Sequence, residues 1–233
     1  MAQEFVPFSG VHYAAMAIGA AAIAVLVVAG RRGGRSRTVA TGLLAFWCLA
    51  AWSIKQLAWN IGGDPAPFHE AFPFHLCGIV AFVAGFALLT RRHTLCAVTY
   101  YWGLAASIQG ILTPALAYGF PHPVFFAFFA NHLAIVGAAI YLPVALGWRP
   151  KPLLPTLGRV ILWSEVYFFT MLPLNFLLDT NYGFLLEKPP NPSLLDHFGP
   201  WPWYLLGLQI ALIVALCLLS LPFLRPKPKT HTS

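Results

Sequence analysis

Charged residues are scarce in this sequence. Only 9% of its 233 residues are Asp, Glu, Lys or Arg, whereas a typical soluble domain carries about 25%. Long polar stretches are also missing, so neither a linker nor a separate soluble domain is predicted. Most of what is present is apolar: 59% of the residues are hydrophobic and the mean hydropathy is +0.72. Together these features exclude an ordinary soluble globular protein and indicate an integral membrane protein.

Seven stretches are apolar and long enough to cross a membrane. A helix needs about 20 residues to span roughly 30 Å of hydrocarbon. The predicted fold is therefore an all-α bundle of seven transmembrane helices, which forms a single domain over residues 1–233. The predicted spans are 10–30, 38–60, 72–90, 94–118, 124–147, 157–178 and 201–223.

The basic residues lie on one side of the predicted spans. All Lys and Arg except Lys55 and Lys188 are at span ends that face the same way, and by the positive-inside rule that side is the cytoplasm. The N-terminus is therefore predicted outside and the C-terminus inside. The net charge of +7 is explained by this topology and by contact with anionic headgroups, so no nucleic-acid partner is expected. The basic group is Arg31, Arg32, Arg35, Arg37, Arg91, Arg92, Arg149, Lys151, Arg159, Arg225, Lys227 and Lys229, and the acidic residues opposite are Glu4, Asp64, Glu70, Asp179, Glu187 and Asp196.

The four cysteines form no recognisable pair. They lie on different spans at different depths, and no CxxC motif indicates a zinc site. No disulfide, metal site or cofactor is therefore predicted. All except Cys77 are interpreted as small buried hydrophobic residues. The four are Cys48, Cys77, Cys96 and Cys217.

Polar side chains gather in the outer half of the predicted bundle. Polar groups in hydrocarbon are costly, so they usually face the bundle interior and mark a site. Six spans contribute such residues near their outer ends, whereas the inner half is mostly Ala, Leu, Ile and Val. The polar residues are Lys55, Gln56, His75, Cys77, Gln109, Thr113, Asn131, His132, Asn175 and Gln209.

The segment AFPFHLCGIV at 71–80 places His75 and Cys77 at the start of the third span. Pro73 suits the first turn of a helix, and the free amides and dipole at a helix start stabilise a thiolate. On a regular helix His75 and Cys77 differ by about 200°, so His75 is poorly placed as a base for the thiol. His132, which is distant in the sequence, is the better candidate. The alternative is that these residues are packed in the core without a catalytic role.

Two further features have more than one explanation. Lys55 and Glu165 lie within predicted spans, and we expect them to pair with each other or with buried amides. The outer loop over 179–204 combines Pro and Gly, which stop helices, with the apolar segments FLL and SLL. We expect this loop to fold back over the bundle mouth as a lid, although its Trp201, Trp203 and Tyr204 are equally well explained as an interfacial belt.

Five segments occur in an order and spacing typical of one family. They are PFHLCGI at 73–79, YYWGLAASIQGILTP at 100–114, NH at 131–132, NYGFLLEKP at 181–189 and SLLDHFGPWPWY at 193–204. From about Phe72 to Tyr204 the sequence resembles the YwaF-like family of bacterial integral membrane proteins, whose vertebrate relative is transmembrane protein 164.

The resemblance implies a seven-helix bundle and a thiol-dependent acyltransferase that moves a fatty acyl chain onto a lysophospholipid. It assigns the nucleophile to Cys77 and the core histidines to His75 and His132. The expected partners are membrane lipids, either phospholipid or lysophospholipid. One departure is visible, because many relatives have an acid after the Thr-Pro of the fourth span, where this chain has Ala115.

The residues are compatible with such chemistry. A thioester intermediate needs an activated thiol, a base and oxyanion donors, which Cys77, His132 and either Asn131 or Gln109 can provide. The alternative is a seven-helix transporter or receptor that binds a small molecule or lipid without covalent chemistry. In either case the site is expected in the extracytoplasmic half of a multi-pass protein of the cell membrane. The supporting site residues are Asn131, Gln109, Thr113, Lys55, Asn175, Asn181, Tyr182 and Gln209.

Overall fold

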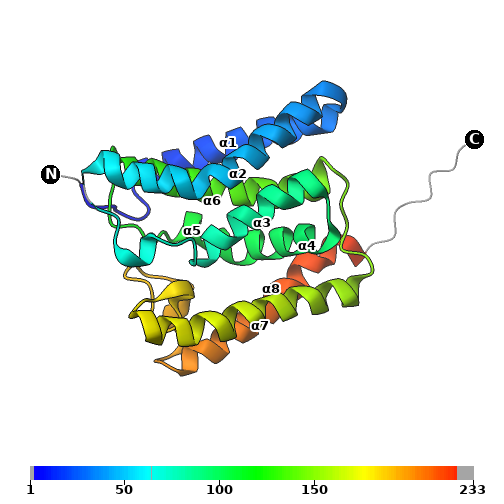
Figure 1. Cartoon of the computed structure of the whole chain (residues 1–233). Helices are drawn as coiled ribbons and strands as arrows, with labels where there is room; N and C mark the ends of the chain where they lie inside the picture. The colour runs from blue at the N-terminus through cyan, green and yellow to red at the C-terminus, as the bar shows by residue number, and fades with distance from the viewer. Residues whose placement is uncertain (1–2, 64, 225–233) are drawn as a thin grey trace, which may run out of the picture.

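The computed structural model describes residues 3–63 and 65–224 (Figure 1). Asp64, Arg225, Lys227 and Lys229 lie outside the described residues. Within the described part of the chain the structure is helical, apart from an isolated bridge between Glu4 and Tyr118. The long helices are α1 (Gly10–Arg32), α2 (Gly34–Gly62), α3 (Leu76–Thr90), α4 (His93–Trp102), α6 (Pro123–Val144), α7 (Leu153–Leu178) and α8 (Trp203–Leu224). The short elements are the 3-10 turns η1 (Phe68–Glu70), η3 (Tyr182–Phe184) and η4 (Leu194–Phe198), the π-helical η2 (Gly103–Ser107) and α5 (Gln109–Leu112).

Six helical stretches are long and apolar enough to cross a membrane. They are α1, α2, the stretch His93–Leu112 that joins α4 to α5, α6, α7 and α8. The exception is α3, which was predicted over 72–90 but begins only at Leu76 and has 15 residues. At 1.5 Å per residue it is about 22 Å long, which is shorter than the roughly 30 Å of hydrocarbon. The apolar helices of a membrane protein are thus confirmed for six of the seven predicted spans.

Two span boundaries differ from the prediction for local reasons. The helix predicted over 94–118 ends at Leu112, because Pro114 disfavours helical geometry at Thr113, whose φ is −133° and ψ 72°. The loop predicted between the first two spans is reduced to a sharp turn at Gly33 and Gly34. Both glycines have positive φ, 78° and 52°, which other residues rarely adopt.

Helix α6 lies in the middle of the bundle and contacts α1, α2, α3 and α4. Figure 1 shows α1 and α2 on one side of the bundle and α7 and α8 on the other. Small residues line the central contacts, and the side chains of Ala84 and Ala138 are fully buried. Small residues let helix backbones approach closely, which is how membrane helices gain packing energy.

The two ends of the bundle carry different connections (Figure 1). The longer loops 65–75, 113–122 and 179–202 gather at one end, which we call the site end. The turns at 33, 91–92 and 145–152 gather at the other, which we call the basic end. The described residues of the predicted basic group lie at this second end, where the His93 ring nitrogen Nε2 is 3.2 Å from the Arg149 carbonyl oxygen. Their predicted location on a common side is confirmed.

Candidate active site

An ion pair at the site end ties α2 to the turn before α3. The Lys55 ammonium donates to the Glu70 carboxylate, and the Gln56 amide donates to the Glu70 carbonyl oxygen over 2.6 Å. Of the two expected alternatives, a pair between Lys55 and Glu165 is not formed, whereas Glu165 pairs with an amide, since it accepts from the Gln209 side chain over 3.4 Å. Sequence reasoning missed Glu70 as a site residue because it lies outside the apolar spans.

The charge states of this turn follow from its burial and its neighbours. Burial raises the pKa of Glu70. The charges of Lys55 and then His75 lower it by more than burial raises it, so the net pKa is below the ordinary value. Burial lowers the pKa of His75 to about 4, and the Glu70 carboxylate only partly opposes this effect. At neutral pH the turn therefore holds a charged carboxylate beside a neutral imidazole.

The turn places His75 and Cys77 at the start of α3. His75 is the N-cap and Cys77 the second helical residue, and both are half-buried. Gly78 permits this arrangement, since a Cβ there would lie 2.7 Å from the Pro73 carbonyl oxygen. The charges that act on Cys77 are those of Lys55 and Glu70. Among residues 3–63 and 65–224, neither His75 nor His132 forms a hydrogen bond with the thiol.

His132 is buried on α6 in a form suited to a base. Its Nδ1 lies 2.8 Å from the Phe128 carbonyl oxygen, and because a carbonyl only accepts, Nδ1 must carry the proton. The lone pair of the neutral ring is therefore on Nε2. This nitrogen faces Gly110, where any Cβ would clash with it. Lys55, Glu70 and His75 all act electrostatically on this ring.

Three other predicted site residues hold the loop that covers His75. The fully buried Asn175 donates to the Tyr182 carbonyl oxygen over 3.0 Å and accepts from the Tyr182 amide over 2.7 Å. Asn181 accepts from the Leu186 amide over 3.0 Å. The Tyr182 ring then meets the His75 ring edge-on, with centroids 5.2 Å apart. These residues position the loop, and their polar groups are largely used in doing so.

The aromatic residues after this loop also anchor it. Tyr204 is buried and its hydroxyl donates to the Phe184 carbonyl oxygen over 2.8 Å. Trp201 donates to the Leu185 carbonyl oxygen over 3.3 Å, whereas Trp203 is 65% exposed. The fold-back of this loop over the bundle is confirmed, and only Trp203 fits a purely interfacial role.

The remaining predicted site residues are spread over several locations. Gln109 and Thr113 lie in and just after α5, beside the glycine that His132 faces, and the Thr113 hydroxyl donates to the Gln109 carbonyl oxygen over 3.2 Å. Asn131 is buried on α6, and its Oδ1 lacks a hydrogen-bond partner within the described chain. Gln209 lies on α8, away from these residues, and its side-chain amide donates to the Glu165 carboxylate.

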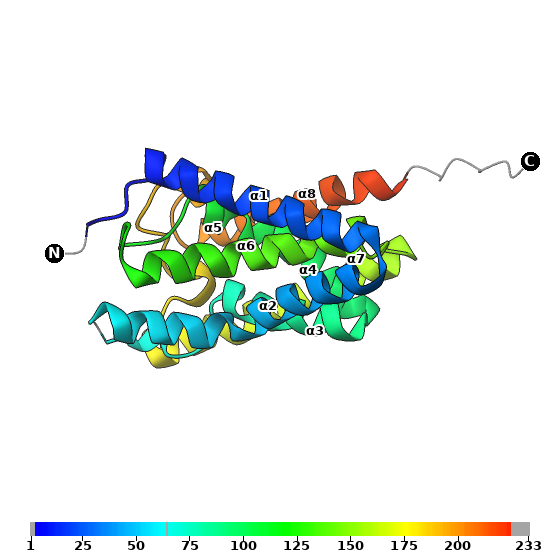
Figure 2. The ribbon, with the colours of Figure 1, turned by 90° about the horizontal axis from the view of Figure 1, so that it is seen from above.

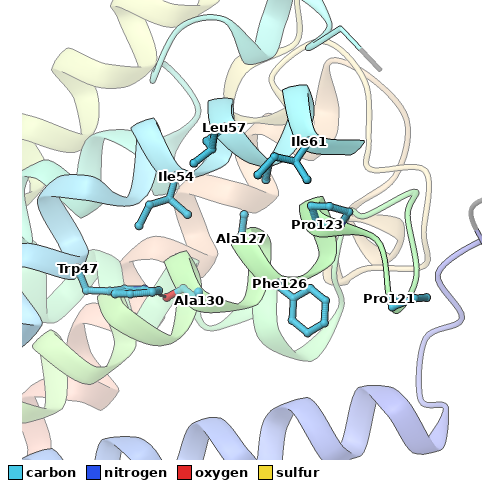
Figure 3. A pocket seen from close by; sticks show the side chains of 10 residues that line it. Trp47, Ile54, Leu57, Ile61, Pro121, Pro123, Phe126, Ala127 and Ala130 are labelled. Atoms are coloured by element: carbon cyan, nitrogen blue, oxygen red, sulfur yellow. Dashed lines mark hydrogen bonds between the residues drawn. The ribbon is translucent and has the colours of Figure 1, made fainter. Parts of the chain in front are cut away.

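Two hollows flank this region. A polar pocket of about 320 Å³ lies between His69 and His75 on one side and the loop from Asp179 to Glu187 on the other. A groove of about 330 Å³ lies between α2 and α6 and is lined by apolar side chains. Figure 3 shows Ile54 and Leu57 of α2 opposite Ala127 of α6 in this groove. The pocket can hold a polar group, whereas the groove suits hydrocarbon.

Residues 7–220, nearly the whole chain, match the TMEM164 family. The chain belongs to the TMEM164 family. This match confirms the resemblance based on the five segments, all of which lie within the matched residues. No curated protein and no solved structure matches the chain. Membership and the apolar helices together identify a membrane protein of the TMEM164 family.

Proposed function

We propose that this TMEM164-family protein is a membrane-embedded acyltransferase that moves a fatty acyl chain between phospholipids through a thioester on Cys77. The observation that carries the proposal is the setting of Cys77 at the first turn of α3. There it lies two residues from His75, in the field of the Lys55–Glu70 pair. The resemblance to transmembrane protein 164 supports the same nucleophile.

The reaction uses groups of this chain. The Cys77 sulfur attacks an acyl-ester carbonyl of a phospholipid, forming a carbon–sulfur bond as the ester carbon–oxygen bond breaks. The thiol proton passes to the free Nε2 of His132 and then to the departing lysophospholipid oxygen. A hydroxyl of a second lysophospholipid reverses these steps, so the acyl chain moves and the thiol is restored.

Two features of the site end suit a lipid substrate. The polar pocket beside His75 can take a headgroup, and the apolar groove between α2 and α6 can take an acyl chain. Burial of hydrocarbon there is favourable, because apolar side chains replace lipid neighbours without loss of hydrogen bonds. The buried and unpartnered Oδ1 of Asn131 remains available to accept from a substrate hydroxyl.

The proposal includes an orientation in the membrane. The basic end faces the cytoplasm by the positive-inside rule, so the N-terminus and the site end face outward. In this arrangement α3 provides the seventh crossing, and the preceding turn 68–75 lies at its outer end. Substrates then enter from the outer leaflet.

Acyl transfer in vesicles tests this function. The purified chain is reconstituted with an isotope-labelled phospholipid donor and a lysophospholipid acceptor, and the labelled product is measured by mass spectrometry. Cys77→Ser should lose all transfer, whereas the matched control Cys48→Ser should keep it because Cys48 is buried among alanines. Full transfer by Cys77→Ser would overturn the nucleophile. Saturable lipid binding without transfer by the wild type would instead support a transporter or receptor.

A further inference from the structure

Three neighbouring side chains, two of which line the polar pocket, present metal ligands. His69, Glu70 and His75 each offer one ligand atom, and these atoms all lie within 4.8 Å of one another. We propose that they form a binding site for a divalent metal ion, and that Zn²⁺ is the ion that fits it best. The proposal extends beyond acyl transfer and does not depend on it.

The donor set is the one that Zn²⁺ prefers. Imidazole nitrogens and carboxylate oxygens bind zinc at about 2.0–2.2 Å, and open sites use three protein ligands with a fourth position free. In a tetrahedral site the ligand atoms are about 3.4 Å apart at these bond lengths, so a pair at the 4.8 Å limit needs to close by about 1.4 Å. His69 can supply this movement because it is exposed on the short turn η1.

Both histidines are available as ligands. In the described chain no hydrogen bond occupies the side chain of His69 or His75, and the two rings meet edge-on with centroids 5.9 Å apart. The edge contact with Tyr182 at 5.2 Å also limits how the His75 ring can turn.

The supporting contacts prepare Glu70 for the ion. Lys55 engages one carboxylate oxygen and leaves the other free, while Gln56 holds the backbone of the same residue. Such outer contacts orient metal ligands and tune their affinity. Asp179 and Glu187 also line the pocket. A divalent cation beside Glu70 offsets part of the negative charge of these carboxylates.

Zinc binding by the full chain tests the site. The protein is purified in detergent without a histidine tag, stripped with a chelator and titrated with Zn²⁺, and the bound metal is quantified by calorimetry and elemental analysis. We expect one Zn²⁺ per chain, and at least a 10-fold loss of affinity in His69→Gln and in His75→Gln. Because His69 is exposed, its variant should keep the wild-type elution profile.

Matched variants separate this site from other zinc ligands. His197→Gln changes an exposed histidine of η4 and should leave zinc affinity unchanged, and so should Cys77→Ser if the thiol is not a ligand. The proposal is overturned if the wild type binds no Zn²⁺ at micromolar concentration, or if His69→Gln and His75→Gln bind it as tightly as the wild type. Because the readout is binding, loss of the zinc site and loss of acyl transfer are distinguished.

Discussion

The basic end and the site end of the bundle differ in how closely their helices lie. At the basic end small residues such as Ala87, near the end of α3, are fully buried, and α1 joins α2 through a turn at Gly33. From this turn α1 and α2 diverge toward the site end with α6 between them (Figure 2). Helices α1 and α2 are therefore closest at the basic end, and they separate toward the end at which we propose that lipid enters (Figure 2).

Buried polar groups occur at both ends of the bundle. At the basic end the Tyr141 hydroxyl lies 3.0 Å from the Thr41 hydroxyl and donates to the Arg37 carbonyl oxygen over 3.3 Å, so it is fully used. At the site end the buried Asn131 Oδ1 and Tyr182 hydroxyl have no partner within the described residues. Leaving buried polar atoms unpaired costs about 1–3 kcal/mol each. Unpaired buried atoms also occur at the basic end, at His93 Nδ1 and Trp148 Nε1, so such atoms do not by themselves mark a substrate site.

The largest effect is expected from removing the candidate base. His132→Ala should slow acylation of Cys77 by about 10²–10⁴, because this is the usual contribution of a general base. Single-turnover acylation by a phospholipid measures it. The matched change at the basic end is His93→Ala, which should leave the rate unchanged. Equal rates in the two variants would remove His132 from the reaction.

A methyl group beside the same histidine should have the next largest effect. Gly110→Ala places a Cβ against His132 Nε2, and a displacement of this size near reacting atoms can cost about 10² in rate. Gly42→Ala is the control, since a Cβ there meets nothing within 4 Å. The same acylation assay applies, and an unaffected Gly110→Ala would mean that the ring position does not matter.

The ion pair of the site end should affect stability rather than only rate. Lys55→Met leaves the Glu70 carboxylate without its partner and should lower the unfolding free energy by about 1–3 kcal/mol. This loss is smaller than for a fully buried ion pair, because the two side chains are 18% and 22% exposed. The low pKa of Glu70 predicts a pH dependence. The pair stabilises the wild type above about pH 4.3, the ordinary value for Glu, and this stabilisation disappears as the pH falls through the lower pKa of the folded state.

Denaturant unfolding in micelles over a pH series measures both effects. The wild type should lose stability below about pH 4.3, and Lys55→Met should lose much less over the same range. Parallel pH profiles for the two proteins would show that the ion pair contributes little to folding.

The smallest effect is expected at the basic end. Tyr141→Phe removes a hydroxyl that serves Thr41 and the Arg37 carbonyl oxygen, and it should lower the unfolding free energy by about 1 kcal/mol. Acyl transfer at Cys77 should be unchanged. A large loss of transfer in this variant would show that the two ends are not independent.

Properties that depend on long averages along the chain could be predicted from the sequence. Hydropathy identified the six helices that are long enough to cross a membrane. The positions of Arg and Lys in the sequence predicted which helix ends lie together at the basic end. The segment around Cys77 was also found, because a thiol and a histidine at the start of an apolar run are unusual.

Features that depend on single contacts could not be predicted. Helix α3 starts four residues late because the backbone of its N-cap His75 is not helical, with ψ 142°, and periodicity does not show this. Lys55 pairs with Glu70 across a turn, so the partner lay in a loop rather than on a helix face. The tautomer of His132, with a free Nε2, could be assigned only from the hydrogen bond between its Nδ1 and the Phe128 carbonyl oxygen.

Intact-mass measurement of the chain after incubation with phospholipid, quenched before acceptor is added, tests the role of Cys77 most directly. The wild type should gain one acyl increment that hydroxylamine removes, as expected of a thioester, and Cys77→Ser should gain none under the same conditions. The same increment on Cys77→Ser, or no increment on a wild type that still transfers acyl chains, would contradict a nucleophilic Cys77.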